Sequence, residues 1–188
     1  MENRTTWAID PMHSEMLFKI KHLVISTVTG SFKKLHGTAI TSGHDFDNAK
    51  VNFTIDVNSI DTNQPHRDEH LLSSDFFESA AYPQIKFQSA SFTKESAGDY
   101  KMTGNLTIKE VTKPVVLNVE YGGSQKDMYG NIKHGFEITG KINRKDFGMA
   151  YNAITEAGGL TLGEEIKIIA NIQVAQLVEK IIEEEVEA

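Results

Sequence analysis

Apolar and polar residues alternate with a period of two through most of the chain, and this pattern constrains the fold more than any other feature. In the stretch VNFTIDV, which begins at Val51, every second residue is apolar. Successive side chains of a β-strand point to opposite faces, so this pattern is typical of a strand with one buried face. Eight segments follow it: 14–22, 28–40, 51–57, 85–89, 100–108, 115–121, 136–142 and 166–174.

The connections between these segments are short and polar or rich in glycine. Many strands with no long helix between them indicate antiparallel hairpins, and hence an all-β sandwich or barrel. Two segments depart from the pattern. Residues 64–80 predict one or two short helical turns within a long connection, and residues 176–188 predict an acidic amphipathic helix.

Composition excludes several classes of function. The net charge of −7 over 188 residues argues against general binding to a nucleic-acid backbone. The absence of cysteine removes thiol nucleophiles and Cys-ligated metal centres. The longest apolar runs are only a few residues, so we expect no stable membrane insertion. The polar N-terminus lacks a secretory core, so we expect a cytoplasmic protein as written, or a periplasmic one if the chain is a trimmed form.

The inward faces contain several small residues, and this bears on whether a barrel would be filled. An eight-stranded barrel is just wide enough either to be filled by side chains or to hold one slim ligand. Small residues facing inward would leave volume between phenylalanine and isoleucine side chains. Periodicity alone leaves both outcomes open. The small residues are Ser14, Gly30, Ser89, Gly104, Gly140 and Ala170.

A series of short motifs, taken together and in order, resembles the YceI-like family. The first motifs are WAIDPMHS at 7–14 (with Phe18, Ile20, Lys21 and His22 after it), GSF at 30–32 and SIDT at 59–62. The most specific are RDEHL at 67–71, DFF at 75–77 and YP at 82–83. GNLTI at 104–108, TKP at 112–114 and RKDFG at 144–148 continue the series. The resemblance therefore covers about residues 7 to 175.

This resemblance implies a fold and a function. It implies an eight-stranded antiparallel lipocalin-like β-barrel over residues 1–175 with a short helical connection. The C-terminal helix predicted at 176–188 is a feature that the core family pattern lacks. The resemblance also implies a homodimer whose apolar tunnel binds polyisoprenoids, such as isoprenoid quinones or polyprenyl pyrophosphates, or other long-chain amphiphiles. We therefore expect a non-enzymatic carrier without metal or cofactor beyond its bound lipid.

The predicted site has a tunnel and a mouth. At the mouth, Phe76 and Phe77 would guard the entrance, and charged residues would either contact the lipid head group or anchor loops through ion pairs. These head-group candidates are Arg67, Asp68, His70, Arg144 and Asp146. The predicted tunnel lining is Phe18, Ile20, Phe32, Val51, Phe53, Ile55, Phe76, Phe77, Phe87, Leu106, Phe136, Ile138 and Ile168.

Two rival hypotheses come from other features. Residues 66–70 spell H-x-x-E-H, so His66 and His70 could ligate zinc, with Glu69 as the base of a hydrolase. The motif lies in a short turn of a β-protein, however, and the YceI-like pattern accounts for most of the same letters without a metal. The third hypothesis is a ligand-free interaction module that acts through its acidic tail.

Overall fold

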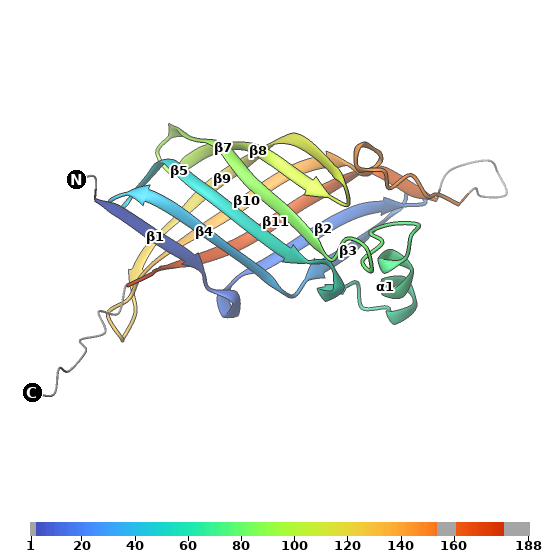
Figure 1. Ribbon diagram of the computed structural model, residues 1–188, viewed down its shortest axis with the longest axis horizontal. Helices are drawn as coiled ribbons and strands as arrows, with labels where there is room; N and C mark the ends of the chain where they lie inside the picture. The colour runs from blue at the N-terminus through green and yellow to red at the C-terminus, as the bar shows by residue number, and fades with distance from the viewer. Residues whose placement is uncertain (1–2, 154–160, 179–188) are drawn as a thin grey trace, which may run out of the picture.

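The computed structural model describes residues 3–153 and 161–178, and it is a closed antiparallel barrel (Figure 1). One α-helix, α1 (Pro65–Leu72), lies in the described residues beside 3₁₀ turns at Pro11–His13, Val57–Ser59 and Arg144–Phe147. The strands are β1 (Arg4–Ile9), β2 (Glu15–His22), β3 (Ser26–Phe32), β4 (Leu35–Ser42), β5 (Asp45–Asp56), β6 (Ile60–Asp61), β7 (Gln84–Ser96), β8 (Asp99–Ile108), β9 (Val111–Lys126), β10 (Ile132–Asn143) and β11 (Leu162–Gln176).

Eight strands form the closed ring. Their order is β1-β4-β5-β7-β8-β9-β10-β11, and pairing of β1 with β11 from Trp7↔Gln176 to Ile9↔Val174 completes it. Strand β1 pairs with the last residues of β11, and β2 pairs with the earlier part of β11, from Leu162 to Asn171. Strand β2 in turn pairs with β3. The prediction of an eight-stranded antiparallel β-barrel with a short helical connection is therefore confirmed.

The predicted strand 28–40 is in fact two strands, β3 and β4. The chain bends between them because the connection after β5 binds the backbone there. The N–H of Lys33 donates to the Ser59 carbonyl at 3.0 Å, and the N–H of Lys34 donates to Ser59 Oγ at 3.0 Å. A second difference is β1, which the alternation did not predict. It ends where Asp10 accepts a hydrogen bond from the Met12 N–H at 3.0 Å and opens a 3₁₀ turn.

Two irregularities keep the long strands facing inward along their whole length. Asn48 has a φ of 62°, and this left-handed residue shifts the alternation within β5, so that Phe46 and Val51 both face the interior. In β7 the register shifts between Ser89 and Ser91, which brings Phe92 inside. The inward set is therefore longer than a strict period of two predicts.

The long connection from β5 to β7 carries α1 to one end of the barrel, the right-hand end in Figure 1, where β2 also ends. None of the helices in the described part of the chain is long and apolar enough to cross a membrane. The predicted C-terminal helix at 176–188 is wrong at its start, because Gln176 is the last residue of β11. The Leu177 N–H then donates to the Thr6 carbonyl at 2.8 Å. Positions 179–188 lie outside the described residues.

Candidate functional site

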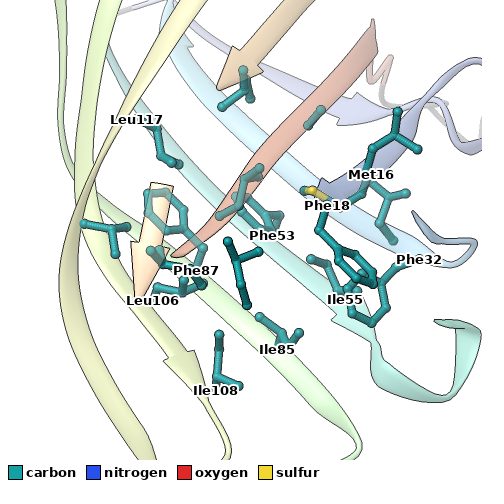
Figure 2. Close-up of a pocket in the computed structure, with 18 of the residues that line it drawn as sticks. Met16, Phe18, Phe32, Phe53, Ile55, Ile85, Phe87, Leu106, Ile108 and Leu117 are labelled. Atoms are coloured by element: carbon teal, nitrogen blue, oxygen red, sulfur yellow. The ribbon is translucent and has the colours of Figure 1, made fainter. Parts of the chain in front are cut away.

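The barrel encloses an apolar cavity of about 440 Å³, within the size range of small-ligand sites. Figure 2 shows side chains from β2, β3, β5, β7, β8 and β9 around one space, and the labelled ones carry only carbon and, in Met16, sulfur. Phe53 stacks on Phe87 with ring centroids 4.9 Å apart, and Phe18 packs on Phe32 at 5.5 Å. An interior of this kind offers a guest dispersion contacts and almost no hydrogen-bond partners.

The cavity lining includes all thirteen residues that the sequence predicts for the tunnel. Their contact with a lipid stays a prediction. Sequence reasoning missed other lining residues, among them Ile85, Met102, Ile108, Leu117, Met149 and Tyr151. The strand residues continue the same alternation and could have been found by extending it. Met149 and Tyr151 lie in an irregular segment with no periodic signal.

The inward glycines do not leave volume, and that expectation was wrong. A β-carbon at Gly30 would overlap the Phe18 ring, and one at Gly140 would lie 2.5 Å from Leu117 Cδ2. At Gly104 it would meet both the Phe87 ring and the Gln88 carbonyl oxygen. These glycines therefore accommodate large neighbouring side chains, and the empty space lies between the ends of those side chains.

Two of the head-group candidates brace the connection before α1. Arg67 donates through Nε to Thr62 Oγ1 at 2.7 Å and through Nη2 to the Thr62 carbonyl at 2.6 Å. Asp68 Oδ1 accepts the Thr62 N–H at 2.9 Å and the Thr62 hydroxyl. Arg67 also lines the cavity, whereas Asp68 does not. The loop-anchor alternative therefore describes Asp68 well, and Arg67 combines an anchoring role with a position in the cavity wall.

An aromatic cluster forms the wall beside α1. The rings of His70, Phe76 and Tyr151 all lie within 5.3 Å of one another, centroid to centroid, and all three line the cavity. His70 Nε2 is 2.8 Å from Asp75 Oδ2, which fixes the imidazole ring. Phe77 packs edge-on against Phe32 at 5.8 Å. The predicted entrance residues thus pack on both the barrel and the segment after β10.

Arg144 is the most deeply buried charged residue of the site, with 1% of its surface exposed. Its guanidinium donates to the carbonyls of Gly163, Met149 and Tyr151 at 2.6–2.8 Å, so it ties the segment after β10 to the start of β11. Within the described residues its Nη2 has no hydrogen-bond partner. Burial lowers the pKa of Arg144, which still remains cationic at neutral pH. The cavity wall therefore contains a positive charge, with a donor that no other described residue uses.

The other predicted polar groups do not assemble into a site. Asp146 is exposed and does not line the cavity. In the H-x-x-E-H motif, His66 and Glu69 are exposed, and His70 is already paired with Asp75. In residues 3–153 and 161–178, no group of three or more His, Cys, Asp and Glu side chains is arranged to hold a metal ion. The zinc-hydrolase hypothesis therefore gains no support from the geometry.

The end of the barrel away from α1 is packed with aromatic rings, which we call the aromatic plug: Trp7, Phe46, Tyr121 and His134. Trp7 is fully buried and donates through Nε1 to Thr41 Oγ1 at 2.9 Å. His134 lies 4.6 Å from Trp7 and bonds to the Tyr121 hydroxyl at 2.8 Å through Nδ1. Phe46 lines the cavity, while Trp7 and His134 lie behind it.

Together these features define a class, a small closed β-barrel with an apolar ligand cavity. A sequence model of the YceI-like domain matches residues 7–174, and the chain belongs to this family. It is 43% identical over 139 residues to the UPF0312 protein plu2095 of Photorhabdus laumondii, covering 74% of this chain and 72% of that protein.

Two solved structures resemble the fold. The Campylobacter jejuni YceI protein is 34% identical, with a TM-score of 0.73 over 85% of this chain and 91% of that one. A Saccharophagus degradans domain, described as polyisoprenoid-binding and implicated in plant cell wall breakdown, is 16% identical. Its TM-score is 0.63 over 91% of this chain and 98% of that one, so this likeness shows the fold alone.

Proposed function

We propose that this chain is a non-enzymatic binding and carrier protein for polyisoprenoids or other long-chain amphiphilic lipids. The observation that carries the proposal is the apolar cavity of about 440 Å³ enclosed by the barrel. Membership of the YceI-like family supports the same class of ligand, and a domain with the same fold is described as polyisoprenoid-binding. The homodimer implied by the sequence resemblance belongs to this proposal, and sedimentation equilibrium of the purified chain tests it.

The physics of the cavity suits a long apolar tail. Each buried methylene contributes about 0.8 kcal/mol, so a chain of ten or more carbons binds tightly without directional contacts. The stacked Phe53 and Phe87 and the pair Phe18 and Phe32 present flat surfaces to such a chain. Selectivity then depends on the head group, because the wall is apolar nearly everywhere else.

Arg144 is the residue that we propose selects the head group. Its charge is desolvated and its Nη2 has no partner among residues 3–153 and 161–178, whereas the Nε and Nη2 donors of Arg67 are directed at Thr62. A buried charged donor gains most from an oxygen acceptor, and an anionic acceptor forms the strongest bond. We therefore expect a head group with an accessible carbonyl, phosphate or carboxylate oxygen.

Native mass spectrometry of the freshly purified protein, followed by organic extraction, tests the proposal. We expect a stoichiometric guest of isoprenoid or long-chain mass. The matched variants are Phe53→Asp, which places a charge in the cavity, and Gln88→Asp, which places the same charge on the outer face of the neighbouring strand. Phe53→Asp should lose the guest and Gln88→Asp should retain it. Equal guest content in the two folded variants would contradict the proposal.

Titration with geranylgeraniol, monitored by displacement of the apolar fluorophore N-phenyl-1-naphthylamine, extends the test to a protein purified without a guest. We expect geranylgeraniol to displace the fluorophore saturably from wild type and from Gln88→Asp, and not from Phe53→Asp. Failure of wild type to bind any long-chain probe would exclude the carrier function.

A further inference from the structure

The turn between β2 and β3 presents three consecutive apolar side chains to solvent. Leu23, Val24 and Ile25, which we call the apolar tip, are 41%, 84% and 88% exposed. Single exposed apolar residues are common on protein surfaces, but a run of three at the end of a hairpin is a localised patch. Nothing in the described part of the chain packs over it.

The backbone of the tip is strained. Leu23 and Val24 have φ angles of 51° and 64°, a region that glycine and asparagine adopt readily and that a β-branched residue rarely occupies. The turn is nevertheless held firmly. The Leu23 N–H donates to the Thr161 carbonyl at 2.8 Å, and Ser26 Oγ donates to the His22 carbonyl at 3.0 Å. A sequence with Asn or Gly at these positions would make the same turn without strain, so turn formation does not explain the apolar side chains.

The tip lies at the rim of the cavity. His22 precedes it directly, pairs with Leu162 across the β2–β11 ladder, and lines the cavity together with Leu162. Val28, on the other strand of the hairpin, also lines it. Figure 1 shows the end of β2 at the same end of the barrel as α1, opposite β1 and the N-terminus. The apolar tip is therefore next to the end of the cavity that His22, Val28 and Leu162 line.

A row of lysines runs along the outer face beside the tip. Lys141 pairs with Lys167 across β10 and β11, and Lys167 pairs with Lys19 across β11 and β2. Lys21 follows on β2, two residues before the tip. Like charges directly opposite each other destabilise a sheet. Of these four lysines, which we call the basic row, Lys141 is the one that forms an ion pair within the described residues, with Glu165 Oε1 at 3.7 Å.

We propose that the apolar tip and the basic row dock this chain on a lipid bilayer that carries anionic head groups. The tip inserts at the head-group boundary, the lysines contact the lipid anions, and the rim of the cavity faces the bilayer. Apolar side chains flanked by lysines are what an anionic membrane surface binds. A chain with a net charge of −7 repels such a surface overall, so a local basic row has a clear role there.

A bilayer suits the patch better than a second protein does. A stable protein interface buries about 800 Å² on each partner, mostly over a broad surface. Three side chains at the end of a hairpin offer much less area, but they can insert into a soft lipid surface. The docking does not depend on which lipid the cavity holds. It rests on the proposed function only for the statement that a lipid passes through the rim.

Co-sedimentation with vesicles tests the docking. One set of vesicles is phosphatidylcholine alone, and the other is equimolar phosphatidylcholine and phosphatidylglycerol. Wild type should bind the anionic vesicles about tenfold more tightly and release them at high salt. The test variant Val24→Asn/Ile25→Ser should lose about tenfold or more in binding, and it should fold well because asparagine tolerates the left-handed conformation. Lys19→Gln/Lys21→Gln should remove most of the preference for phosphatidylglycerol.

The matched control is the turn between β9 and β10, at the other end of the barrel, where Met128 and Tyr129 are also exposed. Met128→Ser/Tyr129→Ser should bind the anionic vesicles as wild type does. The docking proposal is overturned if wild type ignores both vesicle types or if the tip variant binds as wild type does. It is also overturned if the tip variant abolishes only self-association, because the tip is then an interface between copies.

Geranylgeraniol titration without vesicles keeps the two proposals distinguishable. The tip variant should bind this probe as wild type does while failing to bind vesicles. A wild-type protein that docks on vesicles but does not bind geranylgeraniol would retain the docking and contradict the carrier function.

Discussion

Gly30→Ala should close part of the cavity while leaving the barrel folded. The three heavy atoms nearest to a β-carbon at Gly30 all belong to the ring of Phe18, and this ring borders the cavity. The ring can therefore relieve the overlap by swinging into the empty volume. The cost to stability is then that of one displaced rotamer, about 0.5–1.5 kcal/mol.

The effect on ligand binding should be larger than the effect on stability. A displaced phenyl ring occupies the space of two or three methylene groups of a bound chain. At about 0.8 kcal/mol for each methylene, binding weakens by about 2 kcal/mol, or roughly 30-fold. The dissociation constant of geranylgeraniol, measured by displacement of N-phenyl-1-naphthylamine, should rise by this factor.

Two other glycines provide the controls. At Gly104 an added β-carbon meets the Gln88 carbonyl as well as the Phe87 ring, so the β7–β8 backbone must shift. Gly104→Ala should therefore lower the free energy of unfolding by about 1–3 kcal/mol. At Gly135 nothing lies within 4 Å of the added atom, and Gly135→Ala should be neutral or stabilising by about 0.4–1 kcal/mol. A folded Gly30→Ala protein that binds geranylgeraniol with wild-type affinity would refute the placement of Phe18 beside the ligand.

Three further predictions concern charged groups. Arg144→Lys keeps a positive charge but replaces the planar guanidinium, which donates to three carbonyls, by a smaller ammonium group. Urea unfolding should therefore show about 2–3 kcal/mol less stability. In displacement assays the preference for geranylgeranyl phosphate over geranylgeraniol should be smaller than in wild type. Burial alone would raise the pKa of Asp10, but hydrogen bonds from His13 and Lys133 outweigh it and lower the pKa to about 2. Because this pKa is below the unfolded value of 3.8, ionised Asp10 contributes about 2 kcal/mol to the free energy of unfolding, and this contribution is lost as the pH falls from about 5 to 2. The acid unfolding of Asp10→Asn should lack this loss. Burial, with a smaller contribution from His44, lowers the pKa of His134 below its ordinary value of 6.5. As the pH drops below about 6.5 the unfolded state therefore takes up the proton first, and the free energy of unfolding should fall. Unfolding curves of His134→Gln at several pH values should show less of this fall.

Strand periodicity predicted many of the strand residues in the cavity wall. A side chain's face follows from its parity along a strand, which is why residues as far apart as Phe18 and Ile168 could be assigned to one interior. Parity fails where the backbone changes register. The left-handed Asn48 moves the inward set of β5 from the even position of Phe46 to the odd positions of Val51, Phe53 and Ile55. Asparagine tolerates this conformation, but a single asparagine in a strand pattern does not by itself fix the place of a bulge.

The polar part of the site was harder to predict, because it depends on tertiary contacts. Arg144 and Asp146 are two residues apart in one motif, yet the 3₁₀ turn buries the first and exposes the second. Met149 and Tyr151 reach the cavity because Arg144 binds their carbonyls. The alternation is silent on such contacts. The apolar tip is also absent from the sequence prediction. Its three residues are apolar and adjoin a strand, so their sequence does not distinguish an exposed turn from a buried one.

The two ends of the barrel have different chemistry, and this difference gives a bound amphiphile a direction. At one end the aromatic plug is hydrogen-bonded, through Trp7 to Thr41 and through His134 to Tyr121. It presents the ring of Phe46 to the cavity, and His134, whose Nε2 has no partner in the described residues, lies behind that ring. At the other end Arg144 supplies the charged donor, beside a rim framed by the apolar tip and α1. Desolvating a charged or carbonyl head group is costly without a compensating hydrogen bond, so the carrier proposal places the head group at the second end, beside Arg144. If the carrier proposal holds, the tail would therefore enter first and the head group would stop at the rim, where the docking surface would release it to a bilayer.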